Sequence, residues 1–281
     1  MEVSKNNSII IDGADGKKIS ADVSFLPDGI SKPVIIFSHG FKDFKDWGHY
    51  NEMATEFAKA GYYFIKLNFS HNGTTINSPD KIVDFEAFSN NNFSKELMDL
   101  NLLINWIIDS DLDREEKNLE RIFLLGHSRG GGISIIKAKE DSRIKKIATW
   151  GAPVNFENKI PAQAMEYWKN NGTIYVENSR TKEQLPLKYQ IAEDYFNNID
   201  RINVLKATKN ITIPFLLVHG TQDEVVNVKE AKIMKKANNK VELFLIENTD
   251  HYFGITYPYK KNSFTREFKT VMDQTILFFK K

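Results

Sequence analysis

Hydrophobic positions near the start of the chain alternate with polar ones. Residues 9–11 are apolar, and Ile19, Ala21, Val23 and Phe25 recur at every second position. The segment between these two runs contains two Asp-Gly pairs, which are typical of a tight turn between antiparallel strands. We therefore predict an antiparallel hairpin in this part of the chain.

The pattern then changes to short, continuous apolar runs of the kind seen in buried parallel strands. These runs predict strands at residues 34–37, 62–69, 122–125, 144–150, 214–219 and 241–246. Apolar spacings of three and four predict helices between them, one of which opens with a capping box at residues 227–230. Strands that alternate with helices predict an α/β fold with a mostly parallel central sheet and helices on both faces.

Residues 154–208 interrupt this alternation with a segment that is polar and aromatic. We predict a single domain over residues 1–281, in which residues 154–208 form a lid over the carboxyl edge of the sheet, where open α/β sheets bind ligands. Trp168, Tyr175 and Tyr189 are candidates for substrate contact, because aromatic rings suit an acyl group. The alternative is that such rings pack the small core of the lid itself.

The most informative motif is Gly-x-Ser-x-Gly at residues 126–130, between an apolar strand and a helix. In this context the motif predicts a nucleophile elbow, a strained turn that projects the serine Oγ from the sheet. Its glycines are required because a side chain at either flank would clash with neighbouring backbone. Ser128 is therefore the predicted nucleophile. The alternative is a closely packed glycine-rich turn without a catalytic role.

A serine hydroxyl needs a general base and an acid that orients the base. His251 is the best base candidate, because it follows the last predicted strand and comes after the elbow. Asp223, just after the penultimate strand, is the predicted acid. The alternatives are Glu224, with Asp223 only capping the turn, and Asp250, which is weaker because adjacent residues rarely face each other. We expect His127, inside the motif, to point away from the base position.

The negative charge that develops on the substrate carbonyl oxygen also needs hydrogen-bond donors. One main-chain N–H is expected from Arg129, the residue after the nucleophile. The other is expected from the loop after the first central strand, at Phe41, because Gly40 before it allows the backbone to approach closely. These two groups form the predicted oxyanion hole.

Over nearly its whole length, the chain resembles the α/β-hydrolase superfamily. The resemblance rests on four motifs in order: His39-Gly40-Phe41, Gly126-His127-Ser128-Arg129-Gly130-Gly131, His219-Gly220-x-x-Asp223 and Asp250-His251. Together they look like bacterial serine esterases near the feruloyl/cinnamoyl esterase and dienelactone-hydrolase-like branch. They are also similar to the catalytic domain of prolyl-oligopeptidase-type peptidases. Two departures stand out. Dienelactone hydrolases use a cysteine, and this chain has none. The peptidases carry an N-terminal propeller, whereas here only about thirty residues precede the first predicted central strand.

Composition excludes several other classes of function. The 38 basic and 37 acidic residues leave a net charge of +1, which gives no support for a nucleic-acid partner. The absence of cysteine excludes disulfides, thiolate metal sites and a cysteine nucleophile. No apolar run approaches the ~18 residues of a membrane span, and the first residues lack a signal-peptide pattern. We therefore expect a soluble cytoplasmic protein without a membrane partner.

Motifs for metals and cofactors are also missing from the sequence. It contains no His-Glu-x-x-His, no phosphate-binding Gly-x-x-x-x-Gly-Lys-Ser/Thr loop and no Gly-x-Gly-x-x-Gly after a strand. Asp43, Asp46 and His49 are spaced like ligands, but an acidic cluster at a helix start explains them more simply. We expect no metal and no cofactor.

These observations predict a serine hydrolase, either a monomer or a homodimer, that cleaves a small-molecule carboxylic ester through an acyl-enzyme intermediate. Esters of aromatic acids are one candidate class. A serine peptidase or an acyl-CoA thioesterase with the same triad is the alternative among enzymes, because the leaving-group contacts would lie in the insertion. A non-catalytic binding protein of the same fold is the alternative outside enzymes, and the complete triad argues against it.

Overall fold

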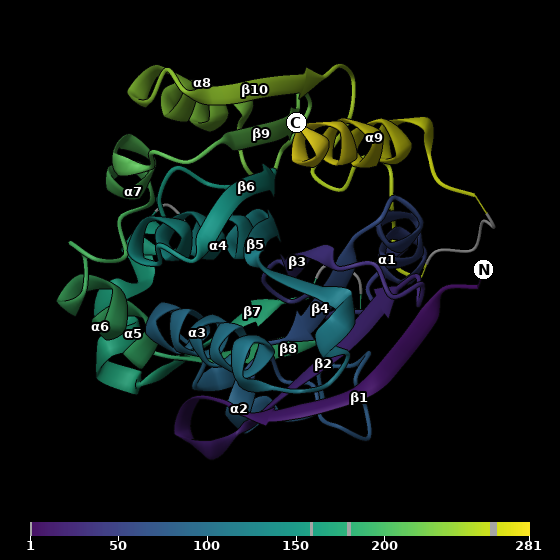
Figure 1. Ribbon diagram of the computed structural model, residues 1–281. Helices are drawn as coiled ribbons and strands as arrows, with labels where there is room; N and C mark the ends of the chain where they lie inside the picture. Colours follow the sequence, from purple (N-terminus) through teal and green to yellow (C-terminus); the bar gives the residue numbers. More distant parts are fainter. Residues whose placement is uncertain (1, 158–159, 179–180, 259–262) are drawn as a thin grey trace.

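A central sheet of eight strands organises the part of the chain that the structure describes, residues 2–157, 160–178, 181–258 and 263–281. In this computed structural model the strand order is β1-β2-β4-β3-β5-β6-β9-β10 (Figure 1). The strands are β1 (Ser4–Asp12), β2 (Lys18–Phe25), β3 (Lys32–Ser38), β4 (Tyr63–Asn68), β5 (Lys117–His127), β6 (Ile144–Trp150), β9 (Phe215–Gly220) and β10 (Val241–Ile246).

The first two strands form the predicted hairpin. Ile9 lies opposite Ala21, and Ile11 lies opposite Ile19, in antiparallel register. Strand β2 is also antiparallel to β4, whereas every pair from β4 to β10 is parallel. The predicted α/β fold with a mostly parallel central sheet is therefore confirmed.

Helices cover both faces of the sheet because its strands are apolar on both sides (Figure 1). Along β3, Ile36 packs into the hydrophobic cluster that includes α3, α4 and α8, while Ile35 and Phe37 pack into the cluster that includes α1 and α9. These helices are α1 (Tyr50–Lys59), α3 (Phe93–Asp109), α4 (Ser128–Glu140), α8 (Val228–Ala237) and α9 (Arg266–Lys280). The 3-10 turns η1 (Ala14–Gly16) and η2 (Arg114–Glu116) precede β2 and β5.

Polar caps fix the start of several helices. The Asn227 side chain accepts a hydrogen bond from the Lys229 N–H at the start of α8, so the N-cap of the predicted capping box is confirmed. Its reciprocal half is not formed, because the Glu230 carboxylate accepts the Val154 N–H at 2.8 Å instead. Helix α2 (Phe85–Ser89) was not predicted, although Asp84 caps it through the Ala87 N–H. Its five residues are too few to show a helical period in the sequence.

The inserted segment folds into short elements of its own. They are η4 (Ala162–Ala164), α5 (Met165–Asn171), β7 (Thr173–Glu177), β8 (Gln184–Lys188), α6 (Gln190–Asn197) and α7 (Val204–Asn210). Strands β7 and β8 form a separate antiparallel pair that the sequence pattern did not reveal. Lys188 at the end of β8 forms a 2.5 Å ion pair with Glu86 of α2, which ties the segment to the main body. The division into one domain with an inserted lid stays a prediction.

No helix within the described residues combines the length and the apolar character needed to cross a membrane.

Candidate active site

The turn from β5 into α4 holds Ser128 in a strained backbone conformation. Ser128 is the first residue of α4 and has a φ of 53°, in the left-handed region that residues with a Cβ rarely adopt. Its side chain is partly exposed at the carboxyl end of the strand. Strain of this kind persists where the surrounding structure enforces it, and it is typical of functional turns.

The glycines that flank Ser128 are required by close packing. A Cβ atom at Gly126 would lie 2.5 Å from the Gly130 carbonyl oxygen. A Cβ atom at Gly130 would lie 2.3 Å from the His39 carbonyl oxygen and 2.4 Å from that of Ser38. These neighbours are main-chain atoms, which cannot move aside without shifting a strand. The predicted steric reason for both glycines is confirmed.

Asp223 and His251 meet at the same edge of the sheet. The His251 Nδ1 lies 2.7 Å from the Asp223 Oδ2, and both residues are buried. The other oxygen, Oδ1, accepts the N–H groups of Val225 and Val226 at 2.9 and 2.7 Å. The carboxylate therefore caps its own turn and also contacts the histidine, so the two interpretations of Asp223 from the sequence are compatible.

The two competing acids lie elsewhere. Glu224 is exposed beside Asp223. Asp250 is exposed as well, and its Oδ1 accepts the N–H groups of Tyr252 and Gly254 within its own loop. Neither carboxylate has a described contact with the imidazole of His251.

Two further histidines, His219 and His127, lie against this pair, and no sequence pattern predicted either contact. The His219 Nε2 is 3.2 Å from the Asp223 Oδ2 and 2.8 Å from the Val226 carbonyl oxygen. The His127 Nε2 lies 3.0 Å from the main-chain oxygen of His251, and the two rings are 4.7 Å apart. A carbonyl oxygen only accepts hydrogen bonds, so Nε2 of His127 carries the proton. His127 thus contacts the loop that carries His251, and the expectation that it points away from the predicted base was wrong.

The electrostatics of the pair favour an ionised acid and a neutral base. Burial alone would raise the pKa of the Asp223 carboxyl, but hydrogen bonds from His219 and His251 hold it below its ordinary value. Burial lowers the pKa of the His251 imidazole, and this effect outweighs the raising influence of Asp223. The Nε2 of His251 is buried and has no hydrogen-bond partner among the described residues. It is therefore free to accept a proton.

The loop after β3 packs directly on the elbow. A Cβ atom at Gly40 would lie 3.1 Å from the Ser128 Cβ. His39 steadies this loop, because its Nδ1 lies 2.8 Å from the Gly40 carbonyl oxygen and its Nε2 lies 3.3 Å from the Asn72 amide nitrogen. Burial lowers the pKa of His39 to about 4, which keeps the ring neutral. Phe41 and Arg129, the predicted oxyanion-hole residues, therefore belong to adjoining segments.

The three predicted substrate contacts fall in different environments. Trp168 is 1% exposed, and its indole N–H donates to the Leu187 carbonyl oxygen at 2.8 Å. Its ring packs edge-on against Tyr189, at 5.9 Å between centroids. Trp168 is thus a core residue of the insertion rather than a substrate contact. Tyr175 of β7 is 65% exposed and remains the strongest candidate of the three.

Comparison with known proteins agrees with this architecture. The family model BD-FAE matches residues 25–237. Monoglyceride lipase from Rattus norvegicus is 22% identical over 290 residues, covering 92% of this chain and 90% of the lipase.

Two solved structures illustrate the fold. Est1E from Butyrivibrio proteoclasticus, solved with ferulic acid bound, superposes with a TM-score of 0.70 at 19% identity, over 96% of this chain and 97% of Est1E. The esterase Pf2001 from Pyrococcus furiosus gives a TM-score of 0.62 at 19% identity, over 99% of this chain and 92% of that one. The resemblance to α/β-hydrolases inferred from the motifs is confirmed.

Proposed function

Because the chain belongs to the BD-FAE family of esterase- and lipase-like hydrolases, we propose that it cleaves carboxylic esters with Ser128 as nucleophile, His251 as general base and Asp223 as the acid that orients it. One observation carries the proposal. A serine in a strained strand-to-helix turn lies at the sheet edge where a buried His–Asp pair leaves a ring nitrogen without a hydrogen-bond partner in the described part of the chain. This combination is the requirement for activating a hydroxyl nucleophile.

In the first half of the reaction the Ser128 Oγ attacks the ester carbonyl carbon while its proton passes to the His251 Nε2. The carbonyl oxygen becomes an oxyanion and accepts the main-chain N–H groups of Phe41 and Arg129. When the tetrahedral intermediate collapses, the bond to the alcohol breaks, and the alkoxide leaves with the proton from His251. The acyl group stays on Ser128 as an ester.

In the second half a water molecule takes the place of the alcohol. His251 removes a proton from this water, and the resulting hydroxide attacks the acyl carbon. Collapse of the second intermediate releases the carboxylic acid and returns the proton to the Ser128 Oγ. Asp223 stays ionised throughout, because its role is to hold the Nδ1–H tautomer and to stabilise the imidazolium.

For the substrate we propose small esters, with esters of aromatic acids as the first class to examine. Ferulic acid bound to Est1E supports this choice. Tyr175 supports it as well, because its exposed ring lies on β7, and Lys42 beside Phe41 donates to the Glu177 carbonyl oxygen of the same strand at 3.0 Å. This contact ties β7 to the loop that packs on the nucleophile.

The proposed nucleophile is tested by Ser128→Ala and a labelled fluorophosphonate. We expect the wild type to be captured covalently and the variant to lose capture, with kcat on an aryl ester reduced ~10⁴- to 10⁶-fold. Ser134→Ala is the matched control, because Ser134 is a buried serine of the same helix. Near-normal turnover by Ser128→Ala, with the fold intact by circular dichroism, would remove Ser128 from this role.

A panel of substrates then separates the alternatives. Feruloyl and other aromatic acyl esters, monoacylglycerols, aminoacyl anilides and acyl-CoA thioesters are compared by kcat/KM on the same preparation. The proposal expects the highest values for aromatic acyl esters. A preference for anilides or acyl-CoA would redirect the assignment to a peptidase or a thioesterase that uses the same triad.

A further inference from the structure

A buried ion pair lies directly behind the elbow. Arg129 follows Ser128, yet its side chain is only 9% exposed, and its Nε donates to the Glu96 Oε2 of α3 at 2.9 Å. Glu96 is 4% exposed, and its other oxygen accepts the Asn91 amide N–H at 2.8 Å. The residue that supplies one proposed oxyanion donor is thus anchored by its side chain to a different helix.

Aromatic rings enclose the guanidinium of Arg129. Its Cζ lies 5.0 Å from the ring centre of Phe41 and 4.4 Å from that of Phe93, within the range of cation–π attraction. Phe41 stacks on Phe88 of α2 at 5.5 Å, and Phe93 stacks on Phe156 of the inserted segment at 4.4 Å. The guanidinium therefore joins the loop after β3 to the elbow, to α3 and to the insertion.

Stability alone does not account for this arrangement. Burying two charges costs desolvation energy that their mutual attraction often fails to recover, and apolar residues of similar volume are frequently as stable. The Arg129 Nη2 also lacks a hydrogen-bond partner among the described residues, which adds to the cost. The Glu96–Arg129 pair is better explained by the positions that it imposes on the neighbouring backbone and side chains.

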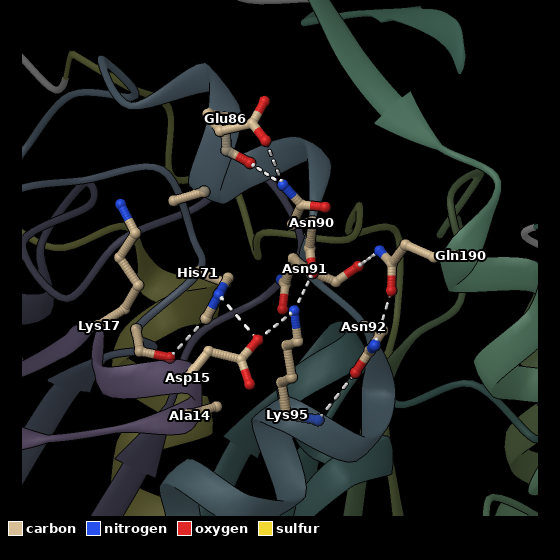
Figure 2. A network of polar contacts seen from close by, with 12 residues as sticks. Ala14, Asp15, Lys17, His71, Glu86, Asn90, Asn91, Asn92, Lys95 and Gln190 are labelled. Carbon is tan, nitrogen blue, oxygen red and sulfur yellow. Dashed lines mark hydrogen bonds and ion pairs between the residues drawn. The ribbon is translucent and has the colours of Figure 1, made fainter. Parts of the chain in front are cut away.

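The helix that provides the carboxylate is itself held on two sides (Figure 2). The Asn92 amide N–H donates to the Gln190 side-chain oxygen of α6 at 2.7 Å. The Lys95 ammonium lies 2.9 Å from the Asp15 carboxylate in the turn between β1 and β2. The start of α3, and with it Glu96, is therefore a fixed point from which to hold Arg129.

We infer that the Glu96–Arg129 pair is a positioning device for the oxyanion hole. This inference rests on the proposed function. The two proposed donors are the N–H groups of Phe41 and Arg129, and the side chains of these same residues touch each other. The clamped guanidinium sets the distance between the two backbones, so both N–H groups point at the oxyanion before substrate arrives. Arg129 thus acts twice, through its backbone as a donor and through its side chain as a spacer.

The test replaces both charges at once, so that neither is left buried alone. In Arg129→Met/Glu96→Leu we expect kcat on an aryl ester to fall about 10- to 100-fold, because small misplacements of a catalytic group have effects of this size. KM and the melting temperature should change little. Affinity for a trifluoromethyl ketone, whose adduct with Ser128 carries an oxyanion, should fall by the same factor as kcat/KM.

The matched control removes a different ion pair, Lys32 and Glu116, whose side chains are 4% and 14% exposed. Their 2.6 Å contact lies where β3 begins, at the opposite end from the Phe41 loop. Lys32→Met/Glu116→Leu should leave kcat and inhibitor affinity unchanged. If the Arg129 double variant does not fold, the single variant Arg129→Lys tests the inference instead. It keeps the positive charge but loses the planar guanidinium group. A lower kcat at unchanged KM and melting temperature then supports the inference.

Three results would overturn it. The first is an unchanged kcat in the folded Arg129 variants. The second is a joint loss of kcat, substrate binding and stability, which indicates a packing role only. The third is a fall in kcat without a parallel loss of inhibitor affinity. Failure of the proposed function is seen separately, since the wild type itself would then lack fluorophosphonate capture at Ser128.

Discussion

At the scale of single residues, Asp223 carries the largest number of roles in the site. One oxygen accepts two main-chain N–H groups of its own turn, and the other faces the ring nitrogens of His251 and His219. A carboxylate fixed by four donors cannot rotate, so the ring of His251 is held in one tautomer and one direction. Removing the charge while keeping the shape is therefore the most informative change.

We predict that Asp223→Asn lowers kcat about 10⁴-fold, because the amide stabilises the wrong tautomer of His251. Glu224→Gln and Asp250→Asn are the matched controls and should stay close to the wild type, since both side chains are exposed. Steady-state kinetics on one aryl ester decides. A larger loss from either control would move the acid role to that residue.

The ionisation of His251, the proposed base, determines the pH dependence that we expect for the activity. The folded-state pKa of His251 lies below the ordinary value of about 6.5, because burial disfavours the imidazolium. In the proposed mechanism attack requires neutral His251, so we expect full activity above this pKa and loss of activity as the pH falls through it. We expect the acid limb of kcat/KM, measured on a neutral ester, to have its midpoint below about 6.5. A midpoint at or above that value would contradict the burial argument.

At the scale of elements, the conformation of the elbow depends on the contact between α4 and β3 as well as on the elbow's own sequence. The start of α4 presses against the end of β3, where Gly130 lies against the carbonyl groups of Ser38 and His39. The same strand end continues into the loop that carries Phe41. Any expansion at this contact therefore moves the oxyanion hole as well as the nucleophile.

We predict that Gly130→Ala destabilises the protein by about 1–3 kcal/mol, the usual cost of forcing extra volume into a packed site. We also expect kcat to fall, because β3 has to move away from the new methyl group. Ser134→Ala in the same helix is the control and should leave both quantities near the wild type. Thermal unfolding and ester kinetics on the two variants measure the effects. Normal stability of Gly130→Ala would refute the crowding argument.

The insertion contains both buried and exposed aromatic residues, of which Trp168 and Tyr175 are one example each. Trp168→Ala should lower the free energy of unfolding by about 3–5 kcal/mol, because it empties a buried site. Tyr175→Ala should leave stability within about 0.5 kcal/mol, as exposed positions do. It should shift relative kcat/KM across esters of different acyl groups by about tenfold. Equal losses on every ester, together with weaker fluorophosphonate capture, would show that this strand supports the catalytic residues instead.

At the scale of the whole molecule, the sheet and the candidate triad could be predicted because both leave local signals. The apolar run at residues 122–125 lies within the longer strand β5, and the run at residues 241–246 coincides with β10. Ser128, Asp223 and His251 each follow a strand, and the carboxyl ends of parallel strands share one edge. Strand order was not needed to place these residues on the same side of the sheet.

The features that the sequence did not predict depend on contacts between segments that are distant along the chain. Helix α2 and the β7–β8 pair are too short to show a period. The positions of His127 and His219 depend on how β5 and β9 approach His251 and Asp223. No local sequence pattern predicts this approach. The Arg129–Glu96 pair joins two helices separated along the chain, and an arginine after the elbow serine predicts nothing of its partner.

The order of the strands along the chain also bears on the moment at which the protein becomes active. The elbow follows β5, whereas the acid and the base follow β9 and β10, which are made later during synthesis. Strand β9 pairs with β6 across the whole inserted segment, so it docks only after that segment has left the ribosome. In the proposed mechanism, a nascent chain that ends before β9 therefore has Ser128 but not Asp223 and His251, and it does not hydrolyse esters. We expect activity only after β9 and β10 have joined the sheet.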